Sequence, residues 1–418
     1  MTAPLQVRAE RRGSAFDLLA GYRAPAGFFM QQESRGVASS DAAAGEVSVG
    51  ASTRADLRRL SIAAMASLRE SSTSVAIGVG VPLATGVIPF EPTSPASLRI
   101  PWAVVRRDDD VATWAIHIGE ESDGPEPIDP ERVVGSAPHD AFRPVQLREE
   151  PSAEDYASMV SEAVGAIRSG TLEKIVLART LAVDAGRQLD ARRLVHRLRA
   201  LEPHCYTFAV PAAGGTLVGA SPELLLERRG AVVRSNPLAG SAPRSGDPDE
   251  DRASAQALEG SGKDREEHAF VVAAVAEILG DLCDDLAYDR EPVLLATANV
   301  WHLSTRFRGT LRDPNLSALD VVAELHPTPA VCGTPTGAAR AAIAAAEPFD
   351  RGPYAGPVGW VDANGDGVWA IALRCAELAG ARARLFAGAG IVAGSEPARE
   401  VEETDRKFRA FLDSLRWG

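Results

Sequence analysis

The 418-residue sequence predicts an α+β protein, in which antiparallel β-sheets carry helices on their outer side. Three observations indicate this class. Apolar stretches of strand length adjoin one another through short turns, several longer segments have one apolar helical face, and no internal repeat is found. A doubly wound parallel sheet is therefore not expected, because it needs strands that alternate with helices.

The composition indicates a globular protein without membrane spans. Hydrophobic residues make up 45% of the chain and charged residues 24%, and no stretch reaches the roughly 18 apolar residues of a membrane helix. The N-terminus lacks the apolar core of a secretory signal, so we expect a cytosolic protein. The net charge of −13 disfavours a nucleic-acid partner but allows an anionic substrate at local basic residues or a metal. The four separated cysteines are expected to be buried rather than bridged.

The N-terminal part, residues 1–150, has a mixed pattern. A Pro- and acid-rich stretch at 121–140 is the best candidate for a linker. The predicted elements before it are a helix at 53–70, a strand at 73–83 and a hairpin formed by 100–107 and 111–119.

The part after residue 150 has longer and more regular apolar patterns. Its helices are predicted where apolar residues recur every three or four positions, and its strands where apolar runs are short. The predicted helices are 155–169, 264–287 and 397–415, and the predicted strands are 174–179, 219–226, 232–239, 300–307, 358–362, 368–378 and 383–387.

Two segments resemble known motifs but depart from them. Residues 362–367 match the opening of a calcium-binding loop, but its twelfth position is Leu373 instead of glutamate, so a hairpin turn is favoured. Residues 388–394 are close to a dinucleotide fingerprint but have one residue too many before the third glycine. The sequence also lacks Walker A, H-E-x-x-H and G-x-S-x-G motifs.

Acidic residues on two predicted helices are candidate ligands for a divalent cation. Glu400, Glu403 and Lys407 share one face of the last helix, where Mg²⁺ would relieve the repulsion between the two carboxylates. For this helix alone, a solvated charged face is the simpler interpretation. Glu267 continues the apolar stripe of its own helix, and a buried carboxylate needs a partner. A salt bridge and a metal ion are equally compatible with that position.

Lys174 and Glu223 are candidate groups for proton transfer. Lys174 begins an apolar predicted strand, so its side chain either extends its charge to solvent or is desolvated. Desolvation would lower the pKa of Lys174 and suit it to act as a base. Glu223 precedes three leucines, and burial there would raise its pKa and suit an acid. The simpler alternative is an ordinary carboxylate at the end of a strand.

Other groups could bind a substrate. Backbone N–H groups in predicted glycine turns at 237–241 and 387–390 could bind a carboxylate, although turn geometry alone would also explain these glycines. Arg374 lies on an otherwise apolar predicted strand, where a buried guanidinium needs a carboxylate. His302 and His326 are favoured as core residues or as supports for neighbouring groups.

Together these segments resemble the chorismate-utilising enzymes, which include isochorismate synthases, salicylate synthases and the large subunits of anthranilate and aminodeoxychorismate synthases. The resemblance implies large antiparallel sheets packed as a sandwich with helices outside. It covers about residues 155–418 in order, which implies a catalytic core at 151–418, and it is only vague over 1–150. The matching strings are EKIVLAR, GASPELLL, PLAGSAPR, KDREEH, NVWHLSTRFRG, ELHPTPAVCGTP, FDRGPYAGPVGW, WAIALRCAEL, LFAGAGIV and EPAREVEETDRKF.

The resemblance also implies roles for individual residues. Lys174 would be the base and Glu223 the acid when water adds at C2 of chorismate and the C4 hydroxyl leaves. The implied ligands of Mg²⁺ are Glu267, Glu400 and Glu403. The implied substrate-binding residues are Gly240, Ser241, His302, Ala330, Arg374, Gly388 and Lys407.

Within the family, isochorismate synthase is the leading interpretation. Lys174 resembles the base of the water-using members, whereas ammonia-using members have glutamine there. Ala239 replaces the nucleophilic lysine of aminodeoxychorismate synthases, and Ala330 resembles isochorismate synthases, since salicylate synthases tend to have threonine near it. A salicylate synthase, an ammonia-using subunit and a catalytically dead regulatory homologue stay open. The resemblance implies chorismate as substrate and no obligatory protein partner, and it leaves open whether a menaquinone or a siderophore pathway uses the product.

Overall fold

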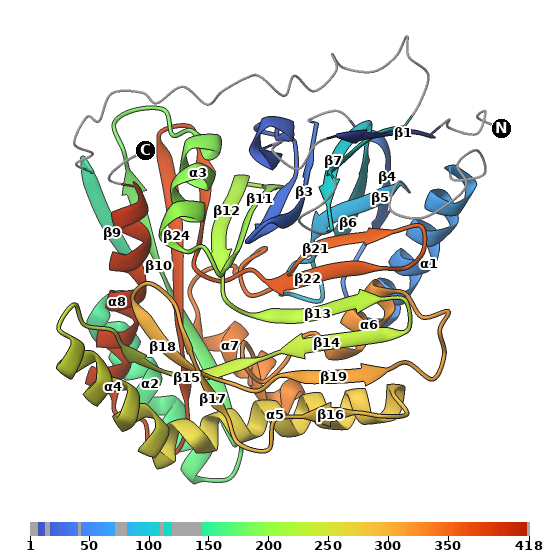
Figure 1. Cartoon of the computed structure of the whole chain (residues 1–418). Helices are drawn as coiled ribbons and strands as arrows, with labels where there is room; N and C mark the ends of the chain where they lie inside the picture. Colours follow the sequence, from blue (N-terminus) through green and yellow to red (C-terminus); the bar gives the residue numbers. More distant parts are fainter. Residues whose placement is uncertain are drawn as a thin grey trace.

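The computed structural model describes residues 7–12, 17–40, 43–71, 82–108, 113–118 and 144–415. Within these residues the chain forms two large antiparallel β-sheets and a small third sheet, with helices around them (Figure 1). The predicted α+β class is confirmed. The predicted linker at 121–140 and all but the end of the predicted strand at 73–83 lie outside the described residues.

The first sheet combines strands from the beginning, middle and end of the chain. Its described strands are β1 (Val7–Arg12), β2 (Phe29–Gln32), β3 (Arg35–Ser39), β7 (Ala103–Arg107), β8 (Thr113–Ile118), β9 (Gln146–Glu150), β10 (Lys174–Asp184), β11 (Tyr206–Ala212), β12 (Gly215–Ser221), β20 (Gly333–Thr334), β23 (Cys375–Ala379) and β24 (Arg382–Ile391). Their order is β1-β8-β7-β3-β2-β11-β12-β23-β24-β10-β20, and β9 also pairs with β10. The β10–β24 pair extends from Ile175 opposite Ile391 to Asp184 opposite Arg382.

The second sheet has the order β16-β19-β14-β13-β22-β21-β5-β6-β4, and the third has β15-β18-β17. The strands of the second sheet are β4 (Ala43–Val49), β5 (Leu83–Val87), β6 (Ala96–Pro101), β13 (Leu224–Arg229), β14 (Val232–Asn236), β16 (Ala287–Tyr288), β19 (Phe307–Thr310), β21 (Pro357–Asp362) and β22 (Gly367–Ile371). Those of the third are β15 (Leu238–Pro243), β17 (Val293–Ala296) and β18 (Val300–Ser304).

Several helices begin where a polar side chain caps free backbone N–H groups. Ser152 caps α2 and Ser261 caps α5 in this way. The helices are η1 (Leu18–Gly21), α1 (Arg54–Ser71), α2 (Ala153–Arg168), α3 (Ala191–Leu201), α4 (Pro248–Gly260), α5 (Gly262–Leu282), α6 (Ala318–Leu325), α7 (Thr336–Ala346) and α8 (Pro397–Leu415). None of those described is both long and apolar enough to span a bilayer.

The two large sheets share one hydrophobic core, as the predicted sandwich requires. Phe28 and Leu177 of the first sheet region belong to the same buried cluster as Leu98 and Trp369 of the second. A second cluster joins the outer face of the first sheet to α3 and α8. All four cysteines are buried and free, which confirms that prediction.

Four runs predicted as single strands are each divided between two sheets. Residues 219–226 contain the end of β12 and the start of β13, and 368–378 contain most of β22 and β23. Residues 232–239 and 300–307 are divided in the same way. The strands on both sides of each junction contain buried residues, so the apolar pattern continues through the junction and does not reveal the break.

Two other predicted boundaries are wrong. The helix predicted at 264–287 ends at Leu282, because Cys283 has extended backbone angles and Ala287 begins β16. The first arm of the predicted hairpin is two strands, β6 and β7, which belong to different sheets. The pairing of β7 with β8 confirms the hairpin itself.

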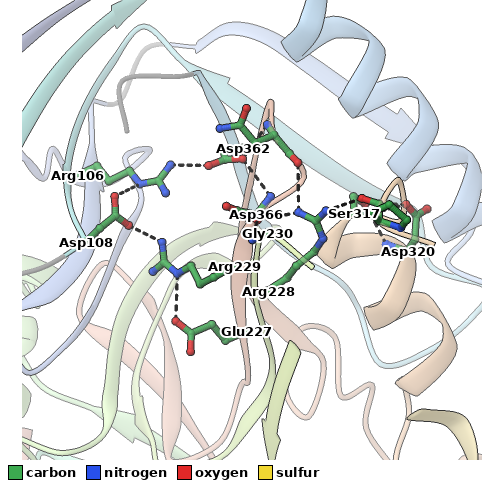
Figure 2. A network of polar contacts seen from close by, with 12 residues as sticks. Arg106, Asp108, Glu227, Arg228, Arg229, Gly230, Ser317, Asp320, Asp362 and Asp366 are labelled. Atoms are coloured by element: carbon green, nitrogen blue, oxygen red, sulfur yellow. Dashed lines mark hydrogen bonds and ion pairs between the residues drawn. The ribbon is translucent and has the colours of Figure 1, made fainter. Parts of the chain in front are cut away.

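A polar network joins β7 to the turn between β21 and β22 (Figure 2). Arg106 donates to Asp362 (2.7 Å) and to Asp108 (2.8 Å), and Arg228 donates to Asp366 (2.7 Å). Asp362 also accepts the backbone N–H of Asp366 (3.0 Å) inside the turn. The pairing of β21 with β22 confirms the predicted hairpin, and the acidic side chains of its turn bind arginines.

Candidate active site

A cavity lies where strands pass between the two large sheets. It is bordered by the β12–β13 junction and the β22–β23 junction, and it contains about 720 Å³ of empty space including its opening. The predicted site residues that line it are Glu223, Gly240, Ser241, Glu267, His302, Ala330, Arg374, Gly388, Glu403 and Lys407. Lys174 and Glu400 are buried and do not line it.

Glu223 is a buried carboxyl group on the junction between β12 and β13. Its backbone N–H donates to Ser221 Oγ (3.2 Å), and its carbonyl accepts the N–H of Ile371 in β22 (3.2 Å). Burial raises the pKa of Glu223 to about 8, although the charge of Lys174 opposes part of the rise. At neutral pH the Glu223 carboxyl group is therefore protonated in most molecules and able to donate a proton.

Lys174 begins β10 and is fully buried beside Glu267 of α5. Its Nζ lies 3.2 Å from Glu267 Oε1, and the ammonium makes no hydrogen bond to any described residue. Glu267 therefore has a salt-bridge partner, which is one of the two interpretations that the sequence allowed. A buried ion pair of this kind keeps both charges compensated inside the protein.

The glycines beside this ion pair lie in a strand. Gly388 and Gly390 belong to β24, so the turn predicted at 387–390 is wrong. A Cβ at position 390 would lie 1.9 Å from Glu267 Oε1, so a side chain there would displace this carboxylate from its place above the strand. The glycine turn predicted at 237–241 is also wrong, because most of it belongs to β15.

The charged face of α8 is buried, so its interpretation as a solvated face is wrong. Glu400 is 1% exposed and accepts from Lys263 Nζ at 2.7 Å. Glu403 accepts from Lys407 Nζ at 2.5 Å and from Ser241 Oγ at 3.1 Å. Burial and the charge of Glu403 raise the pKa of Glu400, whereas Lys407 and Ser241 outweigh burial and lower the pKa of Glu403.

The three predicted metal ligands are thus each paired with a lysine. Within the described part of the chain, no group of three or more His, Cys, Asp or Glu side chains is close enough to hold a metal ion. Glu400 Oε2 is nevertheless buried and has no hydrogen-bond partner among the described residues.

Arg179 of β10 fixes the position of α8. Its fully buried guanidinium donates to Thr404 Oγ1 (3.1 Å) and Asp405 (2.9 Å) of α8, and it also donates to Glu149 of β9. The ring of Phe408 lies 5.6 Å from the same guanidinium. These contacts attach the helix that carries Glu403 to the strand that carries Lys174.

Arg374 lies on the junction between β22 and β23, and not on a strand as predicted. Its φ of 48° places it in the left-handed region, which few residues other than glycine adopt. Its Nη2 is 3.4 Å from His302 Nε2, and burial lowers the pKa of His302 well below its ordinary value, so this ring is neutral. Among the described residues, no carboxylate is within ion-pair distance of Arg374. Its guanidinium can therefore bind an anionic group in the cavity.

Arg351 and Tyr354 are among the lining residues that had no predicted role. Arg351 is buried, pairs with Glu347 at 2.6 Å and donates to the carbonyl of Val331 (2.9 Å). Tyr354 stacks on Phe386 with ring centroids 4.9 Å apart. Both belong to the string FDRGPYAGPVGW, which the resemblance matched, but the string alone did not indicate which of its side chains face the cavity.

Comparisons with known proteins identify the family of this chain. A family model described as "Chorismate binding enzyme" matches residues 105–416. Isochorismate synthase DhbC of Bacillus subtilis is 42% identical over 355 residues, which is 83% of this chain and 83% of that protein. Isochorismate synthase EntC of Escherichia coli K12 is 38% identical over 339 residues, which is 80% of this chain and 82% of that protein.

Solved structures share the fold over nearly the whole chain. The crystal structure of DhbC from Bacillus anthracis has a TM-score of 0.81 at 36% identity, and the match covers 96% of this chain and 99% of that one. The menaquinone-specific isochorismate synthase MenF from Escherichia coli also has a TM-score of 0.81. It covers 98% and 94% of the two chains, but at 24% identity it supports the fold alone.

Proposed function

Because this chain belongs to the family of chorismate-binding enzymes, we propose that it is an isochorismate synthase, which adds water at C2 of chorismate and releases the C4 hydroxyl. The observation that carries the proposal is the set of groups around one cavity. A glutamic acid that is neutral at pH 7 and a guanidinium without a carboxylate partner among the described residues line it, and a buried lysine is paired with the lining Glu267. The reaction needs an acid, a base and groups that bind carboxylates.

The cavity supplies cationic groups for a substrate with two carboxylates. Arg374 and Lys407 both line it, and a guanidinium binds a carboxylate in bidentate fashion. We assign them, with Gly388, to the enolpyruvyl carboxylate and its neighbouring oxygens, and His302 supports the Arg374 side chain. Gly240, Ser241 and Ala330 would line the ring.

The two buried side chains move the protons. Lys174 acts as the neutral amine and takes a proton from water while the water oxygen bonds to C2 and the ring double bonds shift. The proton that Lys174 carries in its ion pair with Glu267 must therefore be released first. Glu223 gives its proton to the C4 hydroxyl, which leaves as water when its bond to C4 breaks. A lysine at position 174 supports water as the nucleophile, because ammonia-using relatives resemble one another in having glutamine there.

We infer that Mg²⁺ would bind the carboxylates beside this cavity after they move closer together, because no three such groups of the described residues are now near enough to share an ion. Glu267, Glu400 and Glu403 offer oxygen ligands, which this cation prefers, and the buried Glu400 Oε2 has no hydrogen-bond partner among the described residues. We assign these three glutamates as its ligands. When bound, the cation would neutralise the ring carboxylate of the substrate. The lysines now paired with these glutamates would have to break their ion pairs before the cation binds.

One assay tests the proposal. The purified full-length protein is incubated with chorismate and MgCl₂, with and without EDTA, and the products are separated by chromatography. Isochorismate that forms only with Mg²⁺ supports the proposal. Salicylate with pyruvate would instead identify a salicylate synthase, an ammonium-dependent aminated product would identify an ammonia-using subunit, and unchanged chorismate would overturn the assignment.

A further inference from the structure

Lys263 lies among the proposed metal ligands but has no part in the proposed reaction. It is in the first turn of α5, one turn before Glu267, and its Nζ is 2.7 Å from Glu400 Oε1. Burial would lower the pKa of Lys263, but Glu400, Glu267 and Glu403 together raise it. All three carboxylates therefore act on one ammonium group.

The lysine and its partner differ in their freedom to move. The Lys263 side chain is 28% exposed, whereas that of Glu400 is 1% exposed. A Cβ at Gly394 would come no nearer to Lys263 Cγ than 3.9 Å, so this side chain is loosely packed on that side. Glu400 belongs to the helix that Arg179 attaches to β10. The lysine can therefore move towards solvent while the carboxylate stays in place.

The other two lysines of the site are less free. Lys174 is 0% exposed and has no direct path to solvent. Lys407 is 14% exposed and donates both to Glu403 and to the carbonyl of Gly388 (2.7 Å). Lys263 is thus the most exposed of the lysines that pair with the proposed ligands.

We propose that Lys263 is a built-in counter-ion, which compensates the buried carboxylates when no metal is bound and competes with Mg²⁺ for Glu400. The inference rests on the proposed function, because it takes Glu267, Glu400 and Glu403 as the magnesium ligands. Without a cation these carboxylates repel one another, and a buried charge without a partner destabilises the fold. The ammonium removes this penalty, and as a consequence Mg²⁺ must break an ion pair before it binds.

The test compares Mg²⁺ affinities of full-length variants without substrate. Lys263→Met keeps most of the side-chain length and removes the charge. Isothermal titration with MgCl₂ should give an affinity at least about tenfold higher than that of the wild type, as expected when a charged hydrogen bond no longer competes. Its melting temperature without Mg²⁺ should fall, and the rise on adding Mg²⁺ should be larger than in the wild type.

Arg265→Met is the matched control. Arg265 lies two residues further along α5, and its exposed side chain pairs with Glu291 away from the ligands. This variant loses the same charge, so an effect of net charge alone would appear in it too, and we expect wild-type affinity. Lys263→Arg keeps the charge and is expected to bind Mg²⁺ no more tightly than the wild type.

An unchanged or weaker affinity in Lys263→Met would overturn the inference, as would a wild type that does not bind Mg²⁺. If the variant is too unstable to titrate, its melting temperature measured against MgCl₂ concentration gives the same comparison. Failure of the proposed function looks different. In that case the affinity of Lys263→Met rises as expected, but the wild type forms no isochorismate.

Discussion

Glu223→Gln separates the effect of Glu223 on stability from its role in the reaction. The pKa of this carboxyl group is raised from 4.5 to about 8, mainly by burial, so the fold favours its neutral form. The neutral form makes its full contribution to the free energy of unfolding below the pKa that Glu223 has in the unfolded chain. This contribution falls by about 1.4 kcal/mol per pH unit as pH rises from there towards 8. At about pH 7.5 the loss amounts to about 4 kcal/mol at most.

Glutamine has nearly the same shape and is neutral at every pH. We therefore expect the free energy of unfolding of Glu223→Gln to exceed that of the wild type by up to about 4 kcal/mol near pH 7.5, and the difference to shrink towards pH 4.5. Urea denaturation at several pH values measures this difference. Glu227→Gln changes a carboxylate on β13 that does not line the cavity, and it serves as the control.

The same variant tests the acid. Wild-type kcat/KM should fall about tenfold per pH unit above about pH 8, as Glu223 loses the proton that it must donate. Glu223→Gln should lose at least about 100-fold in kcat and should lack this alkaline decline. Wild-type turnover in the variant, or the same decline in its residual activity, would refute the assignment. A stability difference that does not change with pH would refute the raised pKa.

Three other substitutions test the site and its support. Lys174→Ala should reduce kcat with chorismate and Mg²⁺ by at least about 100-fold, and near wild-type turnover would exclude Lys174 as the base. Glu403→Ala should abolish Mg²⁺-dependent activity, so a Mg²⁺ requirement like that of the wild type would contradict its role as a ligand. Arg179→Met should lower the free energy of unfolding by about 2–4 kcal/mol in urea titrations, because a buried guanidinium loses its bonds to α8. A change below about 0.5 kcal/mol would show that these bonds do not fix the helix.

The sequence predicts the fold class and four of the eight described α-helices, α1, α2, α5 and α8, because amphipathic periodicity is a local property. It did not predict α3, α4, α6 and α7. The last helix, predicted at 397–415, has the bounds of α8. The strand junctions could not be predicted in the same way. A chain that leaves one buried sheet and enters another keeps an apolar pattern, so nothing local indicates the change of partner.

This limit also affected the site. Arg374 was predicted within a strand, but it lies in a junction and has left-handed backbone angles, which no local sequence pattern indicates. The residue types of the site could be predicted because buried carboxylates and lysines in apolar segments are unusual. The lysine partners could not be predicted, since Lys263 and Glu400 are 137 residues apart. Their pairing depends on how α5 and α8 meet, which is a property of the tertiary structure.

The contact between Gly390 and Glu267 links two positions that are far apart in the chain. A methyl group at 390 would occupy the space of the Glu267 carboxylate, so alanine there would force this carboxylate to another position. The displaced carboxylate would in turn leave Lys174 without its ion pair. During evolution glycine at position 390 is therefore linked to the Lys174–Glu267 ion pair, and a relative with a side chain at position 390 should have lost this pair.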